Sequence, residues 1–300
     1  MGRILTLHHS QQAPGVAVGY ALPSPELRPY VSAYSLTRID PAAGVIHDQV
    51  YPEWANVRFS ADGDMAACTG PGPLVACNPL CGIGPTSHAT HFSLAPGRYW
   101  TIGLLPLGWA RLIGAPANAY ADFWEVADGA SVFARFAPVL SIAATSADED
   151  EAVQRIDAHV LTLLGTPARD EARIAAAHAA LTDREVATVT DLADRAGLTV
   201  RSLERLSKTA FGFPPQLLLR RQRFLRTLSH FMLDPSLAWL HTLDTHYVDQ
   251  AHFIRDFRRF MDTTPRRYAA APHPVLWAAA QARAAAAGTP MQVLQPPAAA

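Results

Sequence analysis

Residues 190 to 215 read TDLADRAGLTVRSLERLSKTAFGFPP, a pattern that predicts two short helices joined by a tight turn. The first helix is expected to end at Gly197, because glycine adopts a positive φ without steric cost. Thr199 then suits the N-cap of a second helix. The apolar residues of that second helix recur at helical spacing, at Val200, Leu203, Leu206, Ala210 and Phe211. Its opposite face carries Arg201, Arg205 and Lys208, which suits a helix presented to a phosphate-lined groove.

A second segment of the same kind covers residues 237 to 268. Asp249 is the expected N-cap of its second helix, whose apolar stripe holds Phe253, Ile254, Phe257, Phe260 and Met261. We expect His252, Arg255 and Arg259 to point away from that stripe. Arginine has the geometry for the commonest specific base contact, a bidentate pair with the O6 and N7 atoms of guanine.

These two segments resemble one known family. The run DQAHFIRDFRRF at 249 to 260, with Thr264, Pro265 and Tyr268 behind it, is similar to the C-terminal consensus of the AraC/XylS family of bacterial regulators. The first segment resembles the same family at its Leu-Ala pair 192 to 193, its Gly-Leu pair 197 to 198 and its Phe-Gly pair 211 to 212. The resemblance implies two three-helix lobes joined by a long helix over about 216 to 232. It also implies two recognition helices in successive major grooves, and a regulator that is not an enzyme.

The resemblance also implies which residues meet DNA. In the first lobe Arg201, Glu204 and Arg205 fall where the family contacts bases, and in the second lobe Gln250, His252 and Arg255 do. Glu204 would accept a hydrogen bond from cytosine N4. Lys208 and Arg259 share the cationic faces of these helices. The predicted DNA-binding set is therefore Arg201, Glu204, Arg205, Lys208, Gln250, His252, Arg255 and Arg259.

Three positions depart from the family pattern. His246 stands at the turn of the second lobe where the family usually has glycine, so we expect a positive φ there with strain of about 1 kcal/mol. Ser207 replaces a usual aromatic residue, and Asp262 replaces a glycine at a position where aspartate tolerates the left-handed region. The first two changes leave a further interpretation open, a protein-interaction module with degenerate DNA binding.

Charge is divided unevenly along the chain. Residues 182 to 270 hold 14 Arg and Lys against 10 Asp and Glu, a balance of +4, whereas residues 1 to 181 hold 10 against 16, a balance of −6. The basic part is thus the part with the helical motifs. Within it, two clusters are candidates for phosphate contacts, or for solvated helix faces: Arg220, Arg221, Arg223 and Arg226, and Arg255, Arg258 and Arg259.

The first 125 residues differ in composition from the rest of the chain: they hold 13 of the 18 glycines, which separate short runs rich in β-branched and aromatic residues. We expect a small barrel or sandwich here, with a short helix at 106 to 114. The run PEWANVRF at 52 to 59 resembles the cupin-like N-terminal domain that accompanies many such regulators, and the mouth of a barrel is a common ligand site. The expected strands cover residues 16 to 21, 31 to 36, 45 to 51, 55 to 60, 74 to 77, 91 to 94 and 98 to 105.

The predicted fold class is therefore α+β, with a β-rich barrel or sandwich (cupin-like) followed by an all-α double helix-turn-helix domain. We expect four parts: a β-rich sensing domain at 1–145, a helical connector at 146–181, the DNA-binding domain at 182–271 and a mobile Ala/Pro-rich tail at 272–300. The connector would hold helices near 151 to 164 and 173 to 181. These could cross a dimer axis or simply join the domains.

One group of side chains in the first domain allows a different function. Cys68, Cys77, Cys81, His88 and His91 fall within 24 residues, and thiolates with imidazoles can hold zinc or copper. Their spacing fits neither a zinc finger nor a metalloprotease helix, and free cysteine is often a small buried hydrophobe. We therefore expect no metal, cofactor or catalytic residue. A metal- or thiol-dependent sensor or enzyme using Cys77, Cys81, His88 and His91 remains the alternative.

The rest of the composition bears on location and partners. No run approaches the roughly 20 apolar residues of a membrane span, and the N-terminus lacks the pattern of a secretion signal. Three cysteines do not suggest a disulfide framework. We expect a cytoplasmic regulator that binds double-stranded promoter DNA and a small-molecule effector. Its other expected partners are RNA polymerase and, where it dimerises, a second copy of the chain in a homodimer.

Overall fold

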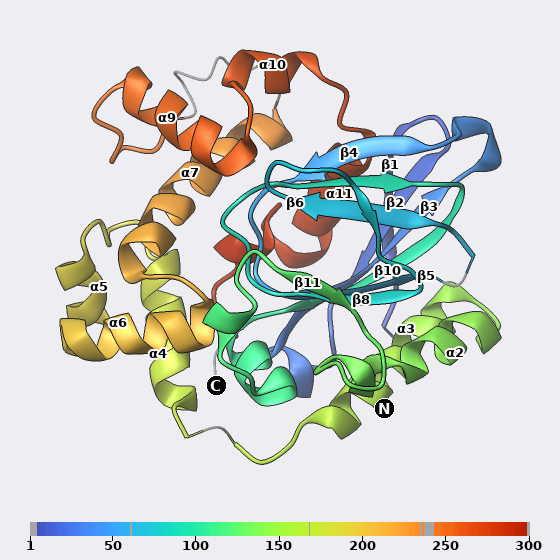
Figure 1. The fold of residues 1–300 in the computed structure, drawn as a ribbon, viewed down its shortest axis with the longest axis horizontal. Coiled ribbons are helices and arrows are strands. Elements are labelled where there is room, and N and C mark those ends of the chain that lie inside the picture. Colours follow the sequence, from blue (N-terminus) through green and yellow to red (C-terminus); the bar gives the residue numbers. More distant parts are fainter. Residues whose placement is uncertain (1–4, 61, 168, 235, 237–242, 299–300) are drawn as a thin grey trace.

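The structure is a computed structural model in which a two-sheet β domain lies beside a helical domain (Figure 1). It describes residues 5–60, 62–167, 169–234, 236 and 243–298. Its α+β architecture is the predicted one, with the β domain first in the chain and the helical domain after it.

The larger sheet has the order β1-β2-β3-β10-β5-β8-β11, and every neighbouring pair is antiparallel. The smaller sheet has the order β4-β9-β6-β7 and is also antiparallel. The strands are β1 His8–Ala13, β2 Val16–Ala21, β3 Val31–Ile39, β4 Ile46–Val50, β5 Asn56–Ser60, β6 Met65–Thr69, β7 Val75–Ala76, β8 Leu80–Ile83, β9 Thr90–Leu94, β10 Gly97–Leu104 and β11 Trp124–Val126.

All seven expected strands are present, and four others were missed. β1, β6, β8 and β11 lack the strong alternation of apolar and polar residues that marks a half-buried strand. In β8 all four residues are buried, because this short strand lies in the interior with neighbours on both sides. Such strands are specified by their partners in the sheet more than by their own sequence.

The predicted connector is divided between the two domains. Helix α3, Glu149–Leu163, packs on the β domain, where Asp157 accepts hydrogen bonds from Tyr34 Oη at 2.9 Å and from the Ser24 amide at 3.0 Å. Helix α4, Glu171–Thr182, packs against α5, α6 and α7 of the helical domain. The expectation of a separate linking unit at 146–181 is therefore wrong, because each helix buries its apolar side in a different core.

The helical domain follows the expected order. After α4 come α5 Val189–Arg195, α6 Val200–Phe211, α7 Pro215–Leu233, α9 Gln250–Met261 and α10 Pro265–Ala270. Helix α7 is the predicted long helix, and α6 and α9 contact it toward its two ends (Figure 1). The expected first helix of the second segment begins at residue 237, and residues 237 to 242 lie outside the described part of the chain.

The remaining short elements belong mainly to the β domain. These are η1 Pro25–Leu27, η2 Pro41–Ala43, α1 Pro106–Gly108, η3 Trp109–Ile113, η4 Ala117–Ala119, η5 Ala134–Phe136, α2 Pro138–Thr145 and, near the C-terminus, η6 Gln292–Leu294. The helical turns at 106 to 113 match the predicted short helix. No helix among the described residues is long and apolar enough to cross a membrane.

The segment after residue 272 is packed, which corrects the expectation of a mobile tail. Helix α11, Pro274–Ala287, lies against β1, β2 and β4 of the β domain and also contacts α7. Its alanine-rich sequence shows little amphipathic periodicity, so it resembled a loose tail. Small side chains nevertheless allow a helix to approach a sheet closely, and Ala278, Ala280 and Ala282 are buried.

Candidate nucleic-acid interface and ligand cavity

Helix α6 is built as the sequence predicted. Thr199 caps it by accepting a hydrogen bond from the Ser202 amide at 3.2 Å, and Gly197 before it has φ +65°. Leu203, Leu206, Ala210 and Phe211 are buried in the core, although Val200 is 41% exposed. The opposite face is open to solvent and carries Arg201, Glu204, Arg205 and Lys208.

Helix α9 repeats this construction. Asp249 caps it by accepting from the His252 amide at 2.6 Å, and Asp262 ends it in the left-handed conformation expected, with φ +53°. Its aromatic stripe packs on α7, where Phe224 contacts the rings of Phe253, Phe257 and Phe260. Among the predicted contact residues of α9, Gln250, Arg255 and Arg259 are exposed.

His252 differs from the other predicted readers. Its side chain is 26% exposed, its ring meets Tyr247 edge-on, and its Nε2 lies 3.2 Å from Arg223 Nη2. These partners face the fully buried carboxylate of Asp256, which accepts hydrogen bonds from Arg220 at 2.6 Å and from Tyr247 at 3.1 Å. His252 is therefore only partly exposed, because it lies beside a buried charge network at the junction of α7 and α9.

Contacts within the fold occupy much of the predicted phosphate-binding cluster on α7. Arg221 is fully buried, and Arg226, 8% exposed, pairs with Asp244. Arg223 is 17% exposed and bonds to the backbone oxygen of His246, and Arg220 is the most exposed of the four at 39%. The cluster is therefore neither a continuous exposed row nor a fully solvated face, because its members mostly join elements of the fold.

His246 does not have the predicted left-handed backbone. Among the described residues other than glycine, positive φ occurs at Asp122 and Asp262. The amide and Nδ1 of His246 lie 3.0 and 2.9 Å from Asp244 Oδ1. His246 therefore stabilises the turn through this aspartate, and the predicted strain is absent.

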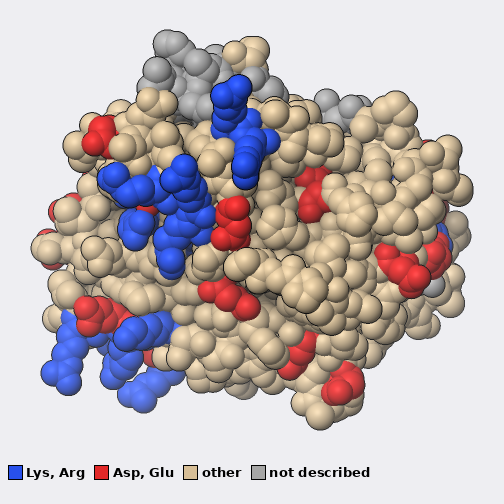
Figure 2. Space-filling model, turned by 45° about the horizontal axis from the view of Figure 1, so that its top comes forward, with Lys and Arg blue, Asp and Glu red and all other residues tan. Residues whose placement is uncertain are grey.

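Basic side chains gather in separate groups along one side of the molecule, while most of the remaining visible surface is uncharged (Figure 2). Between the first and second lobes lies a cleft of about 390 Å³, bordered by the N-terminal end of α5 and by basic side chains of α7. Its lining includes Thr188, Gln216, Arg220, Arg223, His246 and His252. The exposed faces of α6 and α9 carry basic side chains, whereas the arginines that line the cleft are paired with Asp256 and Asp244.

The part of the sequence that contains α6 and α9 matches a known family. Residues 192–271 match the family described as "Helix-turn-helix domain". This segment is a helix-turn-helix domain of the AraC type. It begins inside α5 and ends just beyond α10, so it contains both capped helices, α6 and α9.

Several solved structures are similar to this chain over 35% to 86% of its length. Apo ToxT from Vibrio cholerae has 10% sequence identity and a TM-score of 0.42, over 86% of this chain and 98% of ToxT. The AraC-like transcriptional activator CuxR has 10% identity and a TM-score of 0.31, over 72% of this chain and 82% of CuxR. Oxalate decarboxylase from B. subtilis has 11% identity and a TM-score of 0.27, over 35% of this chain and 30% of that enzyme. No curated protein matches the sequence.

The helix-turn-helix domain is docked on the β domain through Trp54. The guanidinium of Arg221 lies 4.0 Å above the Trp54 ring and donates to the backbone oxygens of Glu53 at 3.3 Å and Thr86 at 2.9 Å. His178 and Phe211 meet the same indole edge-on, with ring centroids 6.0 and 5.6 Å away. Burial lowers the pKa of His178 to about 4, so its imidazole is neutral at neutral pH.

One loop of the β domain reaches the C-terminal ends of both recognition helices. Pro85 lies against Gly212, the left-handed residue that ends α6, and leaves no room there for a Cβ atom. The Ala89 amide donates to the oxygen of Phe260 in α9 at 2.7 Å, and His88 Nδ1 lies 3.5 Å from Asp262. The position of α6 relative to α9 is therefore tied to the β domain by residues 85 to 89.

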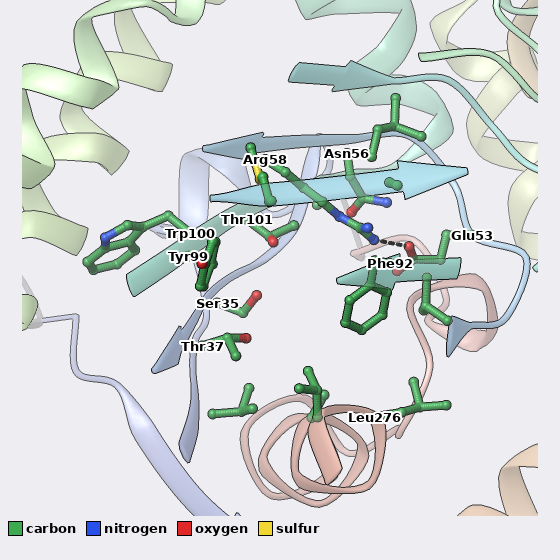
Figure 3. Close-up of a pocket in the computed structure, with 18 of the residues that line it drawn as sticks. Ser35, Thr37, Glu53, Asn56, Arg58, Phe92, Tyr99, Trp100, Thr101 and Leu276 are labelled. Carbon is green, nitrogen blue, oxygen red and sulfur yellow. Dashed lines mark hydrogen bonds and ion pairs between the residues drawn. The ribbon is translucent and has the colours of Figure 1, made fainter. Parts of the chain in front are cut away.

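A cavity of about 120 Å³ lies inside the β domain, between the two sheets and α11 (Figure 3). Arg58 projects into it from β5 and forms an ion pair with Glu53. Burial raises the pKa of Glu53, although Arg58 and Arg283 act in the opposite direction. Other polar groups on the wall include Tyr20, Ser35, Thr37, Tyr51, Asn56 and Thr101, and the apolar ones include Val18, Ile83, Phe92 and Leu94.

The predicted cysteine and histidine group is dispersed along this domain. Cys77 and Cys81 line the cavity, and a hydrogen bond between them lowers the pKa of Cys77 and raises that of Cys81. Cys68 lies opposite His91 across β6 and β9, and His88 faces α9. Within the described ranges of the chain, no three His, Cys, Asp or Glu side chains are grouped to hold a metal ion.

Sequence reasoning located the exposed faces of α6 and α9 but missed the docking residues. Arg221 contacts residues more than 130 positions away in the sequence, and no local pattern marks such a pairing. Trp54 is 1% exposed and lies between the two domains, a position that no local pattern marks. No local pattern marks Arg283, which lies in the segment expected to be a mobile tail.

Proposed function

We propose that this chain is a transcription regulator that binds promoter DNA through α6 and α9. The observation that carries the proposal is the pair of capped, amphipathic helices within an AraC-type helix-turn-helix domain, each with exposed polar and basic residues opposite a buried stripe. The proposed contact residues are Arg201, Glu204, Arg205, Lys208, Gln250, Arg255 and Arg259. His252 has a supporting role in this proposal, positioning the N-terminal turn of α9.

We further propose that the β domain is the sensing part and that its cavity receives a small-molecule effector. An enclosed pocket with apolar walls and a few converging polar groups is the usual form of such a site. Glu53 lines the cavity while its backbone bonds to Thr86 and Arg221, so an effector that moves this residue would act on the docked helix-turn-helix domain. RNA polymerase and a second copy of the chain are proposed partners, and the cytoplasm is the proposed location.

Salt dependence of DNA binding tests the first proposal. Fluorescence anisotropy with labelled duplex DNA should show affinity falling steeply between about 50 and 200 mM salt, with a log-log slope of roughly 0.9 for each phosphate neutralised. Replacing Lys208 with glutamine should make that slope shallower by about one phosphate, whereas Arg173→Gln, on an exposed face of α4, should leave it unchanged. Absence of binding even at the lowest salt would favour a protein-interaction module instead.

A further inference from the structure

Helix α11 forms one wall of the effector cavity although it follows the helix-turn-helix domain in the chain. Val275, Leu276, Ala279 and Arg283 line the cavity, and Figure 3 shows α11 beneath it with Leu276 turned toward the interior. Gln292, further along the chain, also lines it and donates to the oxygen of Leu104 at 3.1 Å. The C-terminal segment is thus part of the cavity itself.

A buried aspartate holds this segment against the β domain. Asp48 of β4 accepts hydrogen bonds from the amides of Val275 and Leu276, both at 3.0 Å, and its other oxygen lies 2.9 Å from His273 Nδ1. His273 in turn stacks on Tyr268 of α10, with ring centroids 4.2 Å apart. The start of α11 is therefore anchored on one side to the sheet and on the other to the last helix of the helix-turn-helix domain.

The cavity carries an excess of positive charge. Two guanidinium groups, those of Arg58 and Arg283, share one carboxylate, that of Glu53. Arg58 is paired with Glu53, whereas Arg283, 3% exposed, donates to Gln295 and has a buried Nε with no hydrogen-bond partner. A buried cation that shares its counter-charge with a second cation is costly, and an anion beside it would remove much of that cost.

We propose that the cavity binds a small molecule with one anionic group, and that Arg283 of the C-terminal helix is the residue that recognises this group. The inference rests on the proposed sensing role of the β domain and deepens it. The rest of the ligand would be apolar, because Ile83, Phe92 and Leu94 line the same space. A volume of about 120 Å³ is close to the roughly 150 Å³ cavity known to hold benzene, so the body of the ligand is about one ring in size.

The ligand would therefore contact the N-terminal β domain and the C-terminal helix α11 at once. Arg58 and Glu53 belong to the β domain, and Arg283 belongs to the segment that the helix-turn-helix domain leads into. Binding would therefore stabilise α11 in its docked position, and with it the arrangement of α10 against β4.

A matched pair of probes tests the proposal on the full chain. Cyclohexanecarboxylate and cyclohexanecarboxamide have the same ring, and only the first is anionic at neutral pH. We expect the carboxylate to raise Tm in a concentration-dependent way and to bind at least about tenfold more tightly by calorimetry than the amide, because a charge-assisted hydrogen bond is stronger than a neutral one. Equal binding of the two, or binding of neither, would overturn the proposal.

Variants of Arg283 test whether its guanidinium recognises the anionic group of the ligand. Arg283→Gln should abolish the preference for the carboxylate, and Arg283→Lys should retain part of it, while Arg173→Gln should change nothing. A variant Arg283→Gln that still prefers the carboxylate would overturn the role of Arg283. These measurements need no DNA, so their outcome is independent of whether the chain binds DNA. A change in DNA affinity on adding the carboxylate is the additional result expected if both proposals hold.

Discussion

Arg205 and Arg255 occupy corresponding places on two helices of the same construction, each exposed opposite a buried stripe. Replacing either with alanine should weaken binding to a specific site by about 1 to 3 kcal/mol, because a bidentate base contact is worth that much. Thermal unfolding should change little. Phe257→Ala should instead destabilise the domain by about 3 to 5 kcal/mol. Circular dichroism melting of the arginine variants that resembles that of Phe257→Ala would show that these side chains support the fold.

His178 gives the docked arrangement a dependence on pH. Its pKa is about 4 in the folded chain, because of burial, against about 6.5 for an exposed histidine. Only the unfolded chain takes up a proton between these values, so stability is unaffected at higher pH and falls as the pH drops from about 6.5 to about 4, by about 3 kcal/mol in total. Urea unfolding should show this loss.

The comparison variants for this measurement are His178→Gln, which cannot titrate, and His230→Gln, which alters an exposed histidine. The first should lose less stability than the native chain on acidification, and the second should follow the native chain. If His178→Gln has the same acid dependence as the native chain, another group controls it.

At the scale of elements, Asp48 tests whether α11 belongs to the fold. Asp48→Ala removes the carboxylate that bonds to three buried groups at the start of α11, the His273 ring and the amides of Val275 and Leu276. We expect it to lower the free energy of unfolding by about 2 to 4 kcal/mol. Asp148→Ala, which removes an exposed N-cap of α3, should cost about 1 kcal/mol. Equal, small effects of the two changes would indicate that α11 is the loose tail expected from the sequence.

The elements differ in how far the sequence could predict them. Helices α6 and α9 were predictable because their signals are local: a capping side chain, a 3.6-residue apolar period and a residue that tolerates positive φ at the end. The docking of helix α11 against the β domain was not predictable, because an alanine-rich helix has no apolar period that marks a buried face. Its anchor, Asp48, lies more than 220 residues away.

The candidate site, too, was only partly predictable from the sequence. The exposed residues of α6 follow from the period of the helix, so Arg201, Glu204, Arg205 and Lys208 lie as predicted. The contacts of His252 could not be predicted in this way, because Tyr247 and Arg223 of neighbouring elements make them. The cavity is lined by segments far apart in the sequence, among them β5, β9 and α11, which come together only in the folded chain.

At the scale of the whole molecule, Trp54 joins the two domains. Trp54→Ala should remove the contacts of Arg221, His178 and Phe211 at once, and large-to-small changes of this kind cost about 3 to 5 kcal/mol. We expect calorimetry to show two separated transitions in place of one. Trp100→Ala alters a buried indole that stacks on Phe59 within the β domain, so it should lower stability without separating the transitions. A single transition for Trp54→Ala would mean that other contacts dominate the coupling.

Selection of binding sites from random duplex DNA tests whether α6 and α9 together bind specific DNA. We expect enrichment of one motif with two parts about one helical turn, roughly 10 base pairs, apart. Arg205→Ala should lose conservation in one part and Arg255→Ala in the other. Recovery of no motif, or of one that neither variant alters, would contradict the assignment of these helices as the DNA-reading elements.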